Sequence, residues 1–209
     1  MKKIIFLLAI QLTGFFLFAQ QKTIAIRCGK LLDVKSSKTL SNQVIVIKGN
    51  KIESVTDAAV FKQTTDSWID LSNYYVLPGL IECHTHVLLQ GDITSEDYDV
   101  QLLKESVPYR TLRASKSCYQ SLMNGFTTIR DLGTEGAGFA DVDLKKAINK
   151  GIIPGPRMFV STLAINTTGH YPIPEQEYAC ELKLPKGLQE ITGAAEGRNA
   201  VREKHATAP

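Results

Sequence analysis

The alternation of strands and helices after Pro78 limits the fold of this chain more than any other feature. Apolar runs rich in β-branched residues alternate there with stretches of helical periodicity, and this order predicts parallel strands joined by right-handed crossovers. The pattern is typical of a doubly wound sheet or of the opening of a (β/α)8 barrel, and periodicity alone does not distinguish them. Three strands alternating with two helices are predicted: a first strand after Pro78-Gly79 that leads to His84, a helix over residues 106–123, a strand over 126–132, a helix over 141–149 and a strand over 157–165.

Residues 23–77 have a different pattern, because short β-branched runs alternate there with turn signals. This is typical of a small all-β domain. Gly49-Asn50 can form a two-residue turn, so Val44 to Val55 is predicted to be a hairpin. Ser72-Asn73 is interpreted as a second turn. Beyond Thr167 the chain is rich in Gly, Pro and Glu, and no further strand is predicted.

The N-terminus has the layout of a cleaved secretory signal, with Lys2 and Lys3 ahead of an apolar run over residues 4–18. A membrane anchor is the alternative, but the run is shorter than the roughly 20 residues that a spanning helix needs. We therefore predict a signal over residues 1–20 and a periplasmic or secreted protein. Without the two lysines, 22 basic and 21 acidic residues remain, which indicates neither a nucleic acid nor a membrane surface as partner.

The strongest chemical motif is His84-Thr85-His86, which follows an apolar run. Alternate side chains of a strand share a face, so His84 and His86 are expected on one face together with Glu82. Neutral imidazoles are good zinc ligands, but a catalytic zinc needs several protein ligands and an open position for water. Two histidines are therefore part of a metal site, or two unrelated polar residues at the end of a strand.

With these residues the sequence resembles the amidohydrolase superfamily, whose first barrel strand carries Pro-Gly, two apolar residues, an acid and His-x-His. The matching residues are Pro78, Gly79, Leu80, Ile81, Glu82, His84 and His86. The resemblance continues through GFTTIRDLG at residues 125–133 and IPGPRMFVSTLAINTTGH at residues 153–170. The chain is most similar to the imidazolonepropionase-like and Xaa-Pro dipeptidase-like branch, with Glu82 in place of the usual aspartate.

The resemblance implies an α/β fold: a (β/α)8 TIM barrel, here with its first strands only, preceded by a small β-sandwich built from N-terminal and C-terminal segments. Residues 21–77 would form part of that sandwich and residues 78–209 the first part of the barrel. His84 and His86 would bind one metal of a centre with one or two ions, most simply zinc. The activity implied is hydrolysis of amide or dipeptide carbon–nitrogen bonds by metal-activated water.

The resemblance also bears on three further residues. His170 follows Thr168-Gly169 where relatives have a TGGH-like turn near the substrate, so it is a candidate for binding a small molecule or dipeptide, or else a solvated loop residue. Arg130 and Asp131 end the second strand and could reach the site, although an ion pair or a helix cap explains them equally well. His205 has no motif around it and is assigned to the surface.

Several parts of the family pattern have no counterpart in the 209 residues. A barrel takes roughly 250 residues, and the family's lysine on the fourth strand, histidines on the fifth and sixth, and aspartate on the eighth are missing. The catalytic acid/base is therefore expected beyond the C-terminus. We expect a truncated and inactive hydrolase, with a noncatalytic exported protein carrying a weak two-histidine metal site as the alternative. The sequence does not indicate the oligomeric state.

Overall fold

The structure is a computed structural model, which describes residues 22–91, 95–170 and 186–207. The chain divides into two compact units, residues 1–78 and 79–209, which are described separately below. The predicted signal over residues 1–20 lies outside the described residues. Within the described part of the chain, no helix combines the length and the apolar character needed to cross a membrane.

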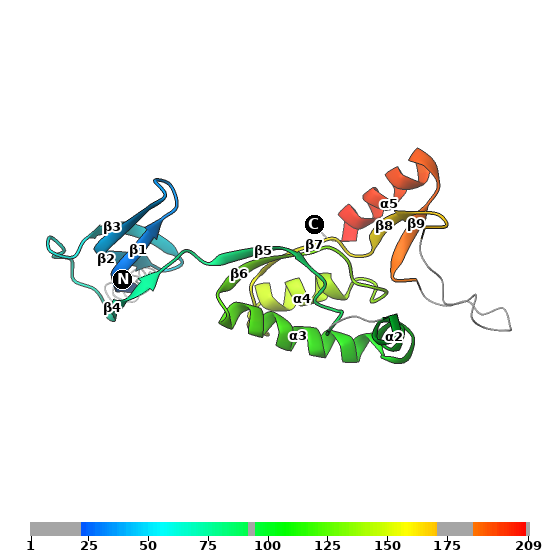
Figure 1. The fold of residues 1–209 in the computed structure, drawn as a ribbon, viewed down its shortest axis with the longest axis horizontal. Helices are drawn as coiled ribbons and strands as arrows, with labels where there is room; N and C mark the ends of the chain where they lie inside the picture. Colours follow the sequence, from blue (N-terminus) through cyan, green and yellow to red (C-terminus); the bar gives the residue numbers. More distant parts are fainter. Residues whose placement is uncertain (1–21, 92–94, 171–185, 208–209) are drawn as a thin grey trace, which may run out of the picture. The chain divides into compact units, whose positions relative to one another are not determined.

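The first unit contains a four-stranded sheet in the order β3-β2-β1-β4 (Figure 1). Its strands are β1 (Thr23–Asp33), β2 (Lys38–Lys48), β3 (Lys51–Asp57) and β4 (Ser67–Val76). The predicted hairpin is confirmed, because β2 and β3 pair antiparallel around Gly49, whose φ is 61°. Small apolar side chains are buried on this sheet, among them Ala25, Cys28, Val44 and Val46.

The turn predicted at Ser72-Asn73 is wrong, because β4 runs through both residues and pairs in parallel with β1. In the register of these strands Cys28 lies opposite Leu71 and Lys30 opposite Tyr75. Residues 72–74 of β4 therefore face the single residue 29 of β1 and form a bulge. Gly29 permits this bulge, since a Cβ at Gly29 would lie 2.0 Å from the Ser72 carbonyl oxygen. The polar residues therefore bend a strand and do not end it.

The second unit is built on a parallel sheet in the order β5-β6-β7, which confirms the predicted alternation of strands and helices. The strands are β5 (Leu80–Thr85), β6 (Phe126–Asp131) and β7 (Arg157–Val160), and the connecting helices are α3 (Val107–Met123) and α4 (Ala140–Asn149). Figure 1 shows both helices on the same side of the sheet. The core between the layers includes Ala114, Cys118, Ile129, Leu144 and Met158.

Helix α3 begins where the sequence predicts, because the Ser106 side chain accepts a hydrogen bond from the Tyr109 N–H at 3.4 Å. It ends before Gly125, whose φ is 92° and whose carbonyl oxygen accepts from the Leu80 N–H. Before α3 lies a separate π-helical turn, η2 (Val100–Lys104), which follows α2 (Ser95–Asp99). The described helices α2 to α5 all belong to the second unit.

Two predictions for the C-terminal part are wrong. The strand predicted over residues 157–165 is interrupted at Thr162, which has a φ of 63° and donates its N–H to Asp141 Oδ2 at 2.7 Å. The chain then re-enters extended structure as β8 (Ala164–Thr167). The sequence predicts no further strand, yet β8 pairs in parallel with β9 (Leu188–Ile191), and α5 (Gly193–Thr207) follows. Partners far apart in sequence therefore determine both features.

Candidate metal centre

The two histidines of the motif converge at the end of β5. The Nε2 atoms of His84 and His86 are 3.3 Å apart, and their ring centroids are separated by 5.3 Å. The strand bulges at Cys83 and His84, because Glu82 lies opposite Ile129 and Thr85 opposite Asp131. The alternation of side chains between the two faces is therefore interrupted between Glu82 and the histidines. The Glu82 carboxylate instead accepts a hydrogen bond from the His84 N–H at 3.0 Å.

The second ring nitrogen of His86 has two acceptors. Nδ1 lies 3.1 Å from the Gly133 carbonyl oxygen and 3.2 Å from Oε1 of Glu135. A carbonyl and a carboxylate accept hydrogen bonds and do not donate them, so this arrangement favours a proton on Nδ1. The lone pair of a neutral His86 ring then lies on Nε2, which faces His84.

The spacing of the two Nε2 atoms fits joint coordination of one ion. Two zinc–nitrogen bonds of about 2.05 Å at a tetrahedral angle place their nitrogens roughly 3.3 Å apart, and the observed separation is 3.3 Å. Among the described residues, however, no group of three or more His, Cys, Asp or Glu side chains is arranged to hold a metal. The pair therefore fits two positions of a centre that needs further ligands.

Asp131 of β6 holds the C-terminal end of β5, next to the histidine pair. Its side chain is fully buried, and Oδ1 accepts from the Val87 N–H at 2.9 Å and from the Thr85 hydroxyl at 3.5 Å. Oδ2 has no hydrogen-bond partner in the described structure. Burial raises the pKa of Asp131 to about 7. An ion pair or helix cap is thus the wrong interpretation of Asp131, which instead joins the C-terminal ends of β5 and β6.

Arg130 points to the same junction from the neighbouring position on β6. Its Nε donates to the Cys83 carbonyl oxygen at 2.8 Å, and the Thr85 hydroxyl donates to the Arg130 carbonyl oxygen at 3.1 Å. Within the described residues Arg130 makes no ion pair. Both polar residues that end β6 therefore hold the backbone around the histidine motif.

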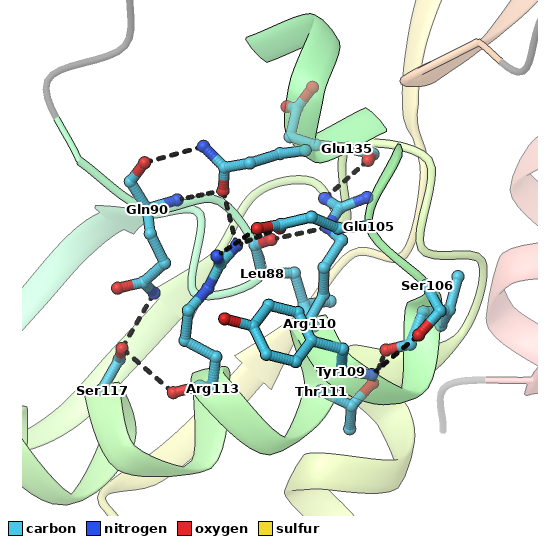
Figure 2. A network of polar contacts seen from close by, with 12 residues as sticks. Leu88, Gln90, Glu105, Ser106, Tyr109, Arg110, Thr111, Arg113, Ser117 and Glu135 are labelled. Carbon is cyan, nitrogen blue, oxygen red and sulfur yellow. Dashed lines mark hydrogen bonds and ion pairs between the residues drawn. The ribbon is translucent and has the colours of Figure 1, made fainter. Parts of the chain in front are cut away.

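Arg110, which sequence reasoning missed, connects the loops that follow β5 and β6. It lies on α3 with 1% of its surface exposed, and its Nε donates to the Leu88 carbonyl oxygen at 3.0 Å (Figure 2). Its Nη2 donates to the carbonyl oxygens of Thr134 and Glu135 at 3.3 and 2.8 Å. Burial lowers the pKa of the guanidinium. An arginine among helical apolar residues gives no local signal of this role.

A neighbouring polar network holds the loop after β5 against α3. The Gln90 N–H donates to Gln101 Oε1, and Gln101 Nε2 donates back to the Gln90 carbonyl oxygen, both at 2.8 Å. Arg113 joins Gln101 to Glu105, with nitrogen–oxygen distances of 2.7 and 2.8 Å (Figure 2). A groove of about 370 Å³ lies beside this loop and is lined in part by His86, Gln90 and Ser117. His86 therefore lies at the start of a loop that this network supports, with the groove beside it.

His170 is exposed in the turn that follows β8. Its N–H donates to the Thr167 carbonyl oxygen at 3.2 Å, and Gly169, with a φ of 80°, donates its N–H to Glu190. In the described part of the chain, no hydrogen bond or ion pair joins the His170 side chain to the histidine pair. Its role in substrate binding stays a prediction, whereas His205 is exposed on α5 as predicted.

The chain is similar in sequence to known proteins. The amidohydrolase family profile matches residues 75–209. Ochratoxinase from Aspergillus niger is 34% identical over 96 residues, which cover 46% of this chain and 18% of that protein. Imidazolonepropionase from Picrophilus torridus is 38% identical over 61 residues, covering 29% of this chain and 14% of that protein.

Solved structures give the same result over more of the chain. A Xaa-Pro dipeptidase with bound methionine in its active site has a TM-score of 0.75 and 29% identity, over 89% of this chain and 45% of that one. A. niger ochratoxinase has a TM-score of 0.71 and 26% identity, over 90% of this chain and 45% of that one. The chain thus spans less than half the length of these relatives, and the resemblance seen in the sequence is confirmed.

Proposed function

The chain belongs to the amidohydrolase family, and we propose that it supplies two ligands of a divalent metal, most simply zinc, in a hydrolase of carbon–nitrogen bonds. The observation that carries the proposal is the 3.3 Å separation of the His84 and His86 Nε2 atoms. Support also comes from the position of the pair, since strand C-terminal ends form the active sites of (β/α)8 enzymes.

The residues of this chain contribute binding and orientation. His84 and His86 would hold the metal through Nε2, while the Gly133 carbonyl and the Glu135 carboxylate retain the proton of His86 on Nδ1. A metal in this position supplies polarisation of a carbonyl and a lower pKa for water. Asp131 and Arg110 hold the two loops that present these groups.

The substrate class we propose is a small amide, a dipeptide or a cyclic amide. The relatives that support it include a Xaa-Pro dipeptidase, an ochratoxinase and an imidazolonepropionase. His170 is proposed to contact the substrate from the turn after β8. This role requires His170→Ala to leave the zinc content unchanged, so a loss of zinc in that variant would contradict it.

We extend the proposal to the fold of the complete enzyme: β5, β6 and β7 correspond to the first strands of a (β/α)8 barrel, and the first unit to one layer of a composite β-sandwich. Its sheet supports this, because a largely apolar groove of about 570 Å³ includes Ile52 and Val55, which are 67% and 43% exposed. A longer form of the protein whose crystal structure leaves this groove open to solvent would contradict the sandwich.

With two histidine ligands and no acid/base assigned, we propose that the chain alone is inactive. Hydrolysis of an amide or dipeptide by the purified chain, lost in His84→Ala, would contradict this.

The competing function is a noncatalytic exported protein with a weak two-histidine metal site. Export itself rests on residues 1–20, and a secreted protein that retains Met1 to Gln20 would argue against a cleaved signal.

The ligand assignment predicts that zinc binding depends on the histidine pair. We expect zinc retained by the wild-type chain after dialysis against micromolar zinc to be lost in the double variant His84→Ala/His86→Ala. The double variant His170→Ala/His205→Ala is the matched control, because it also removes two of the four histidines. Elemental analysis of the three proteins measures the difference, and equal zinc in all three would refute the assigned ligands.

A further inference from the structure

The loop after β6 places a carboxylate against the histidine that is the more buried of the pair. Oε1 of Glu135 lies 3.2 Å from Nδ1 of His86, and the two side chains are 16% and 31% exposed. We propose that Glu135 is a positioning residue for metal binding: it holds the His86 ring in the tautomer that presents Nε2. This inference rests on the metal site of the proposed function and adds a residue outside the histidine motif.

Hydrogen bonds hold both the side chain and the backbone of Glu135. Its other carboxylate oxygen, Oε2, accepts from the Tyr98 hydroxyl at 2.9 Å, and its backbone carbonyl accepts from Arg110 at 2.8 Å. Its φ of 50° is uncommon for a residue with a side chain, so surrounding contacts must stabilise this conformation. The carboxylate is thus directed at His86 by contacts from two helices, α2 and α3.

Gly133 lies directly beside this contact. A Cβ at this position would lie 3.2 Å from Oε1 of Glu135, so a side chain would require a small shift of the carboxylate. The Gly133 carbonyl oxygen lies 3.1 Å from the same Nδ1. Two acceptors therefore converge on one ring nitrogen, and the charged one strengthens its hydrogen bond.

A carboxylate behind a histidine ligand fixes the ring and increases the basicity of the coordinating nitrogen, and its loss typically weakens metal binding about 10–100-fold. Glu135→Gln is the most informative change, because it keeps the size of the side chain. Its amide NH2 can donate to Nδ1, which stabilises the opposite tautomer with the proton on Nε2. The variant is therefore expected to weaken binding while the loop remains in place.

Nitrogen-15 NMR of the histidine rings tests this in the full chain, whose four histidines are few enough to assign. In zinc-free protein we expect His86 to carry its proton on Nδ1, and Glu135→Gln to shift it partly to Nε2. Titration with Zn²⁺ should then give a dissociation constant about 10–100-fold weaker for the variant. His170 and His205 serve as internal references.

Glu203→Gln is the control, since it makes the same chemical change at an exposed position of α5 in the same unit, outside the contacts of the histidine pair. Wild-type tautomer and zinc affinity in this control, with both altered in Glu135→Gln, would support the inference. If Glu135→Gln matched the control in both measurements, the inference would be overturned while the metal site remained. If Zn²⁺ left the His84 and His86 signals of the wild-type chain unchanged, the metal site itself would be contradicted.

Discussion

Arg110→Met is expected to destabilise the second unit by roughly 3–5 kcal/mol, because it leaves buried carbonyl groups without a donor. The carbonyl oxygens of Leu88 and Glu135 lose their donor, and that of Thr134 loses one of two, because the Ala137 N–H also donates to it at 3.1 Å. Methionine fills much of the same space, so loss of packing contributes little to this difference. Urea unfolding followed by circular dichroism at 222 nm measures the effect, since the described helices all lie in this unit.

Arg113→Met is the control for Arg110→Met. It also replaces an arginine of α3, but it removes no hydrogen bond to the carbonyl oxygens that Arg110 binds. Arg113 is 24% exposed and binds the side chains of Glu105 and Gln101, which can turn to water when it is lost, so its replacement should cost less, roughly 1–2 kcal/mol. Trp68, the single tryptophan, lies on β4 of the first unit and reports on that unit by fluorescence. Equal destabilisation by the two substitutions would show that the three carbonyl contacts do not stabilise the loops.

Asp131→Asn is expected to remove a pH dependence of stability. Burial raises the pKa of Asp131 to about 7 from 3.8, and the neighbouring Asp141 carboxylate raises it further, while His86 and the Val87 N–H oppose the shift. The folded chain therefore binds this proton more tightly than the unfolded chain. Between about pH 4 and pH 7 the contribution of Asp131 to the free energy of unfolding should fall as the pH rises, by at most about 4 kcal/mol.

The sign follows from the proton count, since stability decreases with pH wherever the folded state holds more protons. Asparagine keeps the oxygen that accepts the Val87 N–H but does not titrate. Asp141, whose pKa burial also raises, keeps its own pH dependence, but the variant should lack the fall that Asp131 causes. Asp143→Asn makes the same chemical change at an exposed position of α4 and should retain it. Parallel stability profiles for Asp131→Asn and wild type from pH 4 to 7 would contradict the raised pKa.

Local signals in the sequence predict much of this fold. The Gly49 turn, the Ser106 cap and the alternation of strands and helices depend on residues within a few positions of one another, and the structure has all three. The same holds for the convergence of His84 and His86, because residues two apart near the end of a strand lie on one face. Such features need no knowledge of distant partners.

The features that the sequence did not predict depend on contacts between distant segments. Arg110 binds a carbonyl 22 positions earlier, and Asp131 binds an amide 44 positions earlier. The break at Thr162 involves Asp141 on another element, and the bulge opposite Gly29 turns Ser72-Asn73 from an expected turn into part of a strand. Tertiary packing overrides local preference at each of these positions.

The central claim is that the Nε2 atoms of His84 and His86 bind one metal ion, and X-ray absorption of the zinc-loaded chain tests it most directly. The account predicts two imidazole nitrogens at about 2.0–2.1 Å from zinc in the wild type and their loss in His84→Ala/His86→Ala. A sulfur ligand at about 2.3 Å, which the exposed Cys83 beside the motif would supply, is not expected. An unchanged imidazole signal in the double variant, or a sulfur ligand in place of the histidines, would contradict the account.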